Sequence, residues 1–502
     1  MSPRRLPVRL VLPLVGFALY ALAAVPATND PPFALVQPGL HTLANTYSNA
    51  WGDVDNDGDV DLAVSTQRDG IRLFRNDAGT LVSVGASLGL PEANYELRGV
   101  SWGDYDGDGF IDLLAGPIEK NRLSLVFHND GGRHFTEVGA AIGLTMPNRS
   151  ARQTNFVDLD NDGDLDVYAT DRAGANQVYR NDGGRFTQAF VGQGVSDVRA
   201  SVGSCWFDYD SDGDLDVFLA NQAGAADALW RNDGATFTDV APALGLTGPH
   251  RTAEEGGVGC AVGDYDNDGD FDLFVANYGR SQLYRNNGDG SFTDVAPAVH
   301  LDVENHAVSA DWGDFDNDGD LDLSIMSYDG PAGQQQPKDA LFRNDGAQGF
   351  VNVIDRTSPL NRGDHGTQFV DVDGDGGLDL SITDGYSPEG GHFLFHNTLP
   401  AEAKARSLAV LVLDAQGHFT QVGAEVRVFD ARGRVLASRQ VVSGGGYNSQ
   451  RTGPVHVGLT SLAPVTVEVT FMGQKGRTTQ RVPGIRPADY ARKPLIVRRT
   501  AQ

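Results

Sequence analysis

Beyond residue 27, this 502-residue sequence contains no apolar run of the about 18 residues that a membrane-spanning helix requires. The first 27 residues contain a shorter apolar run, from Leu10 to Val25, which follows three arginines and ends among small residues such as Ala23 and Ala27. This pattern predicts a secretory signal peptide over residues 1–27, with an uncleaved anchor as the alternative. We therefore expect a secreted protein, extracellular or periplasmic, without stable membrane insertion after signal cleavage.

The chain also lacks the basic surplus of a nucleic-acid-binding protein. It has 39 Lys and Arg against 67 Asp and Glu, a formal net charge of −28. Of these acids, 33 are aspartates inside seven nine-residue segments, and the remaining 34 nearly balance the bases. The acidity belongs to those segments, so the composition predicts no nucleic-acid partner.

The seven segments are copies of one motif with Asp at positions 1, 3, 5 and 9 and Gly at position 6. Carboxylates this close raise one another's pKa unless a cation lies among them. Acidic, oxygen-only loops favour calcium. We therefore predict about seven Ca²⁺ ions, one per copy, bound by the four Asp side chains and by the backbone carbonyl at position 7.

The residues at these five positions are the predicted metal site. They are Asp53, Asp55, Asp57, Asp59 and Asp61; Asp104, Asp106, Asp108, Phe110 and Asp112; Asp158, Asp160, Asp162, Asp164 and Asp166; Asp208, Asp210, Asp212, Asp214 and Asp216; Asp264, Asp266, Asp268, Asp270 and Asp272; Asp314, Asp316, Asp318, Asp320 and Asp322; and Asp371, Asp373, Asp375, Gly377 and Asp379.

The motif is not an EF-hand. The EF-hand shares its first six positions but requires Glu at position 12 between two helices, and this Glu is absent here. Position 12 is apolar in every copy: Val64, Ala115, Ala169, Leu219, Val275, Ile325 and Ile382. Short β-branched and apolar runs such as DLAVS follow each loop and predict strands. The motif therefore indicates strand-loop-strand calcium sites, with a metal-free acidic loop as the alternative.

The motif recurs every 50 to 57 residues within a larger repeat. An aromatic residue lies two positions before the first Asp in every copy except the fifth, where it is Val262, and an aromatic-Arg-Asn or aromatic-His-Asn element follows the second strand. With a fourth strand such as the one at Phe237, each repeat predicts one blade of a β-propeller. The seventh repeat lacks its fourth strand, so we expect Phe33–Val36 to supply it and close the ring.

We therefore predict an all-β fold: a seven-bladed β-propeller over residues 28–400, followed by a small C-terminal β domain over residues 405–502.

Cysteine is nearly absent, with only Cys205 and Cys260, three and four residues before the fourth and fifth loops. An exported protein permits a disulfide. However, the offset of one residue points the two side chains to opposite faces of a strand, which favours two free thiols.

The blades resemble the FG-GAP/VCBS repeats of integrin-α-type propellers. The tail, with GAEVRVFDARGRVLASRQVVSGGGYNSQ from Gly423 and VHVGL at Val455, resembles the ASPIC/UnbV domain. Together they are similar to the cartilage acidic protein family and its bacterial relatives. The tail departs from the expected pattern at VHVGL and FMGQKG, which replace VHFGLG and a W-P-x-G element. The resemblance implies an extracellular calcium-binding protein.

The loops on the face opposite the calcium loops are the candidate ligand site, because propellers bind ligands on such a rim. The best candidates are Arg152, Arg251, Glu254, His306, Tyr328 and His365, and the wider rim adds Arg68, Glu119, Arg172, Glu255, Tyr278, Arg280, Asp329 and Tyr386.

The first function hypothesis is a binding module for an extracellular protein or glycan, with structural calcium. The second is a calcium-stabilised enzyme of lyase or cyclase type on the same rim or in the central channel. No residue is assigned a catalytic role, and ordinary solvated loops are the third interpretation.

Overall fold

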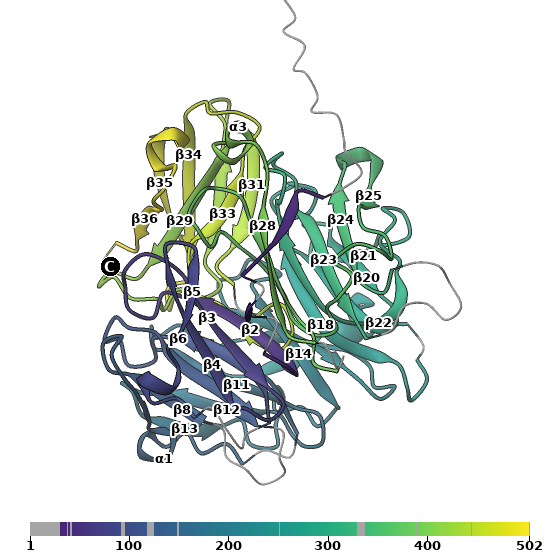
Figure 1. The fold of residues 1–502 in the computed structure, drawn as a ribbon. Coiled ribbons are helices and arrows are strands. Elements are labelled where there is room, and N and C mark those ends of the chain that lie inside the picture. Colours follow the sequence, from purple (N-terminus) through teal and green to yellow (C-terminus); the bar gives the residue numbers. More distant parts are fainter. Residues whose placement is uncertain are drawn as a thin grey trace, which may run out of the picture.

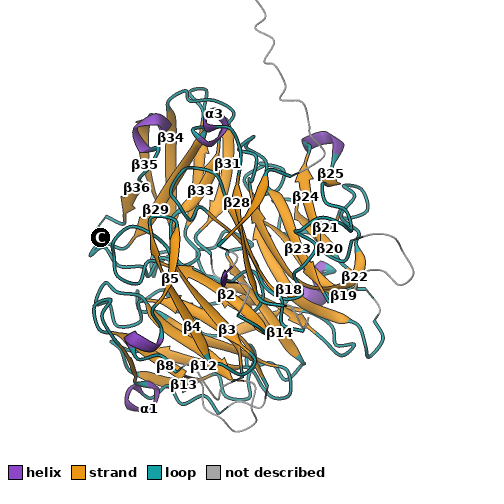
Figure 2. Ribbon diagram, in the orientation of Figure 1, coloured by secondary structure: helices purple, strands orange, loops and turns teal. Residues whose placement is uncertain are grey.

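The computed structural model describes residues 31–37, 39–40, 43–91, 96–117, 125–147, 150–249, 251–328, 337–386, 390–442 and 444–500. The predicted signal peptide, Glu119 and Asp329 lie outside these residues. Within them, no helix is long and apolar enough to cross a membrane. Strands are the main regular elements of the described residues, as Figure 2 shows, with loops and turns between them and single short helical turns in some connections.

Seven four-stranded antiparallel sheets follow one another along the chain and form the blades of a propeller (Figure 1). Their strands are β2 (Thr46–Gly52), β3 (Asp61–Thr66), β4 (Ile71–Asp77) and β5 (Thr80–Ser83) in blade 1; β6 (Leu97–Gly103), β7 (Asp112–Pro117), β8 (Leu125–Asn129) and β9 (Phe135–Glu137) in blade 2; β10 (Ala151–Val157), β11 (Asp166–Asp171), β12 (Gln177–Asn181) and β13 (Phe186–Ala189) in blade 3; β14 (Ser201–Phe207), β15 (Asp216–Asn221), β16 (Ala228–Asn232) and β17 (Phe237–Asp239) in blade 4; β18 (Gly256–Gly263), β19 (Asp272–Arg280), β20 (Gln282–Asn286) and β21 (Phe292–Asp294) in blade 5; β22 (Glu304–Gly313), β23 (Asp322–Ser327), β24 (Ala340–Asn344) and β25 (Phe350–Asn352) in blade 6; and β26 (Thr367–Val370), β27 (Asp379–Thr383), β28 (His392–Asn397) and β1 (Phe33–Val36) in blade 7.

The first strands of successive blades contact one another around a central channel, and β2 contacts β26 to complete the ring. The predicted ring closure is confirmed, because β1 pairs antiparallel with β28 from Phe33↔Asn397 to Val36↔Leu394. Blades 5 and 6 are also joined, because the end of β19 pairs with the start of β22. The ring therefore leaves no open seam between its first and last blades.

Aromatic residues just before the loops form much of the core between blades. Trp51, Trp102 and Trp206 are fully buried. The indole Nε1 of Trp102 donates to the carbonyl of Ala50 in the preceding blade at 3.1 Å, and Trp312 does the same to Ala261 at 3.2 Å. The aromatic residue repeated in the sequence thus packs and hydrogen-bonds one blade to the next.

The expectation of two free thiols is wrong, because Cys205 and Cys260 form a disulfide with their Cα atoms 6.1 Å apart. Cys205 lies on β14 of blade 4 and Cys260 on β18 of blade 5. Both belong to one apolar cluster between these blades. Adjacent blades stack front to back, so the two cysteines must point to opposite faces of their own sheets. The offset of one residue therefore permits the bridge.

The C-terminal β domain contains two sheets, one ordered β33-β29-β36 and the other β31-β30-β34-β35. Its strands are β29 (Ser407–Leu413), β30 (Glu425–Phe429), β31 (Val435–Gln440), β32 (Ser449–Gln450), β33 (Val455–Gly458), β34 (Val465–Phe471), β35 (Thr478–Ile485) and β36 (Leu495–Arg498). A valine-rich cluster that includes Val410, Val426 and Val467 fills the space between the sheets. Helical turns among the described residues include η2 (Ala86–Leu88), α1 (Gly139–Ile142), α2 (Ala241–Leu244), η3 (Gly346–Gln348), α3 (Ala401–Lys404) and η4 (Pro487–Tyr490).

One segment of this domain, residues 444–452, enters the central channel of the propeller, and we call it the channel segment. Its strand β32 pairs in parallel with β6 of blade 2. The amide of Gly446 donates to Ala310 of blade 6 at 3.2 Å, and Gln450 exchanges two hydrogen bonds with the backbone of Phe156 in blade 3. The channel is therefore filled by the C-terminal domain, which the sequence analysis did not predict.

Candidate functional site

The seven acidic loops share one backbone geometry. In the first, the carboxylate of Asp53 accepts the amides of Asp57 and Gly58 at 3.1 and 3.0 Å. The carboxylate of Asp61 accepts the amides of Val54 and Asn76 at 2.8 Å each. Position 6 has a positive φ in every copy, from 89° at Gly376 to 104° at Gly163, which is why the motif requires glycine there. The loop therefore curls its aspartates toward a common centre.

The carboxylate oxygens of these loops have the chemistry and spacing of calcium ligands. Carboxylate oxygens of Asp53, Asp55 and Asp57 lie within 4.8 Å of one another, and similar groups occur in other loops. At position 3, one carboxylate oxygen of Asp55, Asp160 and Asp316 is buried without a hydrogen-bond partner among the described residues. A buried carboxylate oxygen without a partner is costly unless a cation binds it. These oxygens therefore point to a bound cation with oxygen ligands.

Burial also raises the pKa of the loop carboxylates, and neighbouring aspartates add to the shift. The pKa of Asp61 rises from 3.8 to about 7, and that of Asp166 rises to about 8. Position-1 carboxylates behave similarly, with pKa values of about 6 for Asp104 and about 7 for Asp371. Without a cation, these groups would hold protons near neutral pH, because the charged forms are poorly solvated and repel one another.

The C-terminal domain covers the face that carries these loops. Arg477 Nη1 contacts Asp208 Oδ2 at 3.0 Å, and Arg427 Nη2 donates to the carbonyl of Gly269 at 2.8 Å. Lys404 pairs with Asp375, and His456 Nε2 lies 3.3 Å from the carbonyl of Gly376. The acidic loops therefore form an interface between the propeller and the C-terminal domain. No sequence pattern identified these contacts, because they join residues that are far apart in the chain.

At the opposite end of the channel, one residue per blade surrounds the tip of the channel segment. Each lies six positions before the first Asp of its loop: Tyr47, Arg98, Arg152, Val202, Val258, Val308 and His365. At the centre lies Tyr447, which is buried in the same apolar cluster as Tyr47 and the three valines. We call these seven residues with Tyr447 the mouth ring. The shared offset from the loop motif is a signal that could have identified all seven.

His365 and Arg98 connect the polar half of the mouth ring. The His365 imidazole packs 4.6 Å from the Tyr47 ring and 4.8 Å from the Tyr447 ring. Its Nε2 lies 2.9 Å from the Tyr328 hydroxyl and 3.2 Å from Arg98 Nη1, and its Nδ1 faces the carboxylate of Asp364. The Arg98 guanidinium lies 3.8 Å above the Tyr47 ring, within the range of a cation–π interaction.

Burial and the nearby charges set the protonation of this cluster. Burial, and then the positive charge of Arg98, hold the pKa of His365 well below its usual value, so the imidazole is neutral. Burial alone would raise the pKa of Tyr447, but Arg98 and Arg152 more than offset it and lower that pKa. The mouth ring thus combines a neutral imidazole with phenols that face buried guanidinium groups.

The structure places the six predicted ligand residues differently. His365, Tyr328 and Arg152 lie together at the mouth ring. Arg251 forms a buried ion pair with Asp227 at 2.6 Å, which makes it structural. Glu254 is exposed, and His306 packs 5.0 Å from the Tyr278 ring near Tyr328. Sequence reasoning missed Arg98, Tyr47 and Tyr447, of which the last comes from the C-terminal domain.

Comparisons with known proteins agree with the repeat and the tail. The FG-GAP-like repeat family matches residues 53–115, 158–219, 208–275 and 264–325, and the ASPIC and UnbV family matches residues 415–487. Cartilage acidic protein 1 of Xenopus tropicalis is 28% identical over 148 residues, 28% of this chain and 23% of that protein. The Homo sapiens protein is 31% identical over 114 residues, 22% of this chain and 17% of that protein. The matches thus span less than a quarter of each relative.

Two solved structures show a limited likeness. An Agrocybe aegerita lectin, described as recognising non-reducing terminal N-acetylglucosamine, overlaps 62% of this chain and 81% of its own, with 18% identity and a TM-score of 0.40. BBS1N in complex with ARL6DN overlaps 73% of this chain and 98% of its own, with 8% identity and a TM-score of 0.46. The chain is an FG-GAP-repeat β-propeller that carries a C-terminal ASPIC/UnbV domain, and it is similar to cartilage acidic protein 1.

Proposed function

We propose that this protein is an exported β-propeller binding module that calcium stabilises. The seven loops would hold one Ca²⁺ each through side chains at positions 1, 3, 5 and 9 and the carbonyl at position 7. The near identity of the loops supports a structural role, because catalysis by a metal normally requires one distinctive open site. Calcium would neutralise aspartates that otherwise repel one another beneath the C-terminal domain.

The binding face in this proposal is the end of the propeller that carries the mouth ring. The observation that carries it is the position of the C-terminal domain, which covers the calcium loops and leaves the opposite end uncovered by it. There, the side chain of Tyr386 is 51% exposed, and its hydroxyl accepts a hydrogen bond from Arg98 at 3.0 Å. Exposed aromatic rings beside arginine favour recognition of a protein or a glycan.

A glycan array and a protein-interaction screen with the calcium-loaded protein test this proposal. A specific hit should weaken at least tenfold in Tyr386→Ala, because the variant removes an exposed ring and its hydroxyl contact with Arg98. Val82 is also exposed but lies elsewhere, on β5. Val82→Ala is therefore the matched control and should bind normally. Equal binding by both variants would exclude the mouth-ring end as the binding face.

The second candidate is an enzyme of lyase or cyclase type. The observation in its favour is the convergence of His365, Asp364 and Tyr328, with hydrogen-bond contacts on both imidazole nitrogens. Against it, the His365 side chain is fully buried by its neighbours. A ligand recovered chemically unchanged from the protein supports the binding module, whereas a cleaved or cyclised product supports the enzyme.

A further inference from the structure

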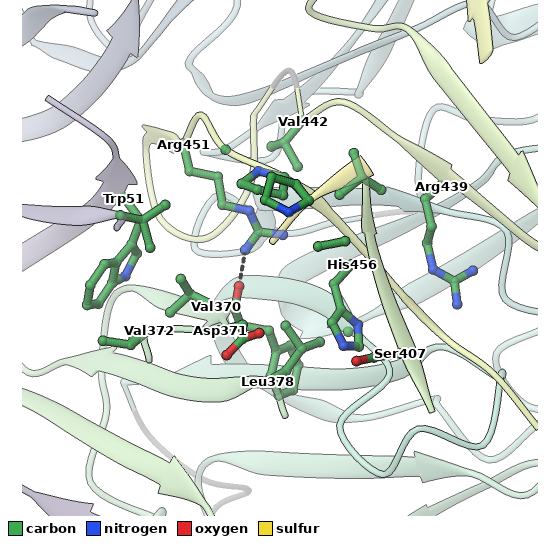
Figure 3. Close-up of a pocket in the computed structure, with 18 of the residues that line it drawn as sticks. Trp51, Val370, Asp371, Val372, Leu378, Ser407, Arg439, Val442, Arg451 and His456 are labelled. Atoms are coloured by element: carbon green, nitrogen blue, oxygen red, sulfur yellow. Dashed lines mark hydrogen bonds between the residues drawn. The ribbon is translucent and has the colours of Figure 1, made fainter. Parts of the chain in front are cut away.

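A cavity of about 340 Å³ lies between the propeller and the C-terminal domain, on the calcium-loop side of the molecule (Figure 3). The propeller contributes residues just before and within the loops of blades 1, 6 and 7 and residues of blade 5. The C-terminal domain contributes Val442, Arg451 and His456, together with residues 490–494. This volume suits a small molecule, and interfaces between domains are a usual place for such sites.

Apolar surface forms somewhat more than half of the walls of the cavity. Trp51, Trp312 and Phe369 line it from the propeller, while Val442 and Val455 face them from the C-terminal domain. In Figure 3, the labelled side chains of Trp51, Val370, Leu378 and Val442 surround the same space. Such walls favour an apolar ligand body, because its transfer from water is favourable.

Nε of Arg439, which lines the cavity, is buried without a hydrogen-bond partner among the described residues, and the same is true of two further nitrogens of lining residues. The first is Nε1 of Trp51, although the equivalent indoles of Trp102 and Trp312 donate to the preceding blade. The second is Nδ1 of His456, whose Nε2 lies near the carbonyl of Gly376. These nitrogens have almost no accessible surface in this structure, so a ligand oxygen would satisfy them after a small shift of the lining, and an apolar ligand alone would leave them without a partner.

The edge of the cavity is basic. Arg492 and Lys493 line it and are exposed to solvent. Among the acidic residues of the lining, Asp311 is paired with Arg451 at 2.7 Å, and Asp59, Asp371 and Asp373 belong to predicted calcium loops. Lys493 Nζ lies 5.9 Å from the centre of the Tyr490 ring, and both cations at the edge are exposed and in a position to attract an anionic group.

We propose that this cavity binds a small amphipathic carboxylic acid that also carries a hydroxyl or carbonyl oxygen. The apolar body lies between Trp51, Trp312 and Val442. The carboxylate lies at the edge beside Arg492 and Lys493, and the second oxygen meets the unpartnered polar atoms inside. This site differs from the mouth ring and does not depend on the proposed recognition of a protein or glycan.

Isothermal titration of the full, calcium-loaded protein with three matched probes tests the assignment. We expect 10-hydroxydecanoate to bind more tightly than decanoate, and decanol to bind at least tenfold more weakly than decanoate. Because Trp51 and Trp312 line the cavity, binding should also change tryptophan fluorescence. No binding of either acid at millimolar concentration would overturn the proposal, and equal binding of decanoate and decanol would overturn the carboxylate assignment.

Variants then locate the bound probe. Val442→Trp should fill the cavity and reduce the affinity for all three probes at least tenfold, as should Ala409→Phe on the wall formed by β29. The double variant Arg492→Gln/Lys493→Gln should remove most of the preference for decanoate over decanol. Leu462→Trp, at an exposed position of the same domain, is the control and should bind normally. Unchanged binding in folded Val442→Trp and Ala409→Phe would place the probe elsewhere and refute the site.

Discussion

At the scale of single residues, some positions of the repeat keep the same side chain in every blade, whereas others differ from blade to blade. The loop aspartates are the same in every blade, and they meet the same backbone amides. The position six residues earlier varies from Tyr to Arg, Val and His, and these residues together surround Tyr447. The repeated positions hold the fold, whereas the varied ones distinguish one sector of the channel from another.

The loop carboxylates predict how pH affects the metal-free protein. The folded state raises the pKa of Asp61 to about 7 and of Asp166 to about 8, from 3.8. Folded protein therefore holds protons that the unfolded chain releases, and the free energy of unfolding falls as pH rises from about 4 to about 8. After chelation, thermal melting should occur at a lower temperature at pH 8.5 than at pH 5.5, and calcium should remove most of the difference. A flat pH profile without calcium would contradict this.

Replacing one loop aspartate should affect one blade. Asp266→Ala removes a ligand of the fifth loop, so we expect the calcium content to fall by about one ion and the melting temperature to decrease. Binding at the mouth-ring end should persist, because that end of blade 5 lies opposite the loop. Metal analysis and calorimetry of the variant check this, and loss of all calcium from a folded variant would show that the sites are not independent.

Tyr447 provides a test of the mouth ring. Tyr447→Ala removes a buried ring among Tyr47, His365 and Arg98 and should cost about 3 to 5 kcal/mol of unfolding free energy. Tyr447→Phe keeps the ring and loses the hydroxyl contacts, at about 1 kcal/mol. Denaturant unfolding in saturating calcium measures both. If the two variants were equally stable, the packing role of the ring would be wrong.

At the scale of elements, local patterns predicted the blades well. Each blade consists of strands close together in sequence, so the loop motif, the aromatic position and the Asn turns were enough to predict it. Cys205 and Cys260 were misjudged because strand alternation was applied within one sheet, whereas the bridge joins two stacked sheets. The channel segment was missed because Gly446 contacts Ala310 and Tyr447 contacts Arg98, and both partners are more than a hundred positions away, a relation that no periodicity encodes.

The disulfide joins two blades across a sequence separation of 55 residues. A cross-link that closes a loop of this length lowers the conformational entropy of the unfolded chain, which stabilises the folded state by about 4 kcal/mol. The double variant Cys205→Ser/Cys260→Ser should therefore be clearly less stable than the oxidised protein, with its calcium content unchanged. Reversible denaturation with and without reductant measures the difference. Equal stability under both conditions would show that the disulfide does not stabilise the fold.

At the scale of the whole molecule, the C-terminal domain and the propeller are interlocked. The domain covers the calcium loops and fills the channel, and it supplies Tyr447 to the mouth ring at the far end. Its contacts with Asp208, Asp375 and the carbonyl of Gly376 also link its position to the loops that are predicted to hold calcium. Calcium binding and docking of the C-terminal domain are therefore expected to depend on one another.

The measurement that tests this account most directly is the melting temperature of the full protein as a function of free calcium. The account predicts that the melting temperature rises steadily as calcium fills sites with Kd values of about 10⁻⁴ to 10⁻³ M, and that protease resistance rises with it. A melting temperature that is independent of calcium, together with an activity that chelation abolishes, would contradict a structural role for the metal.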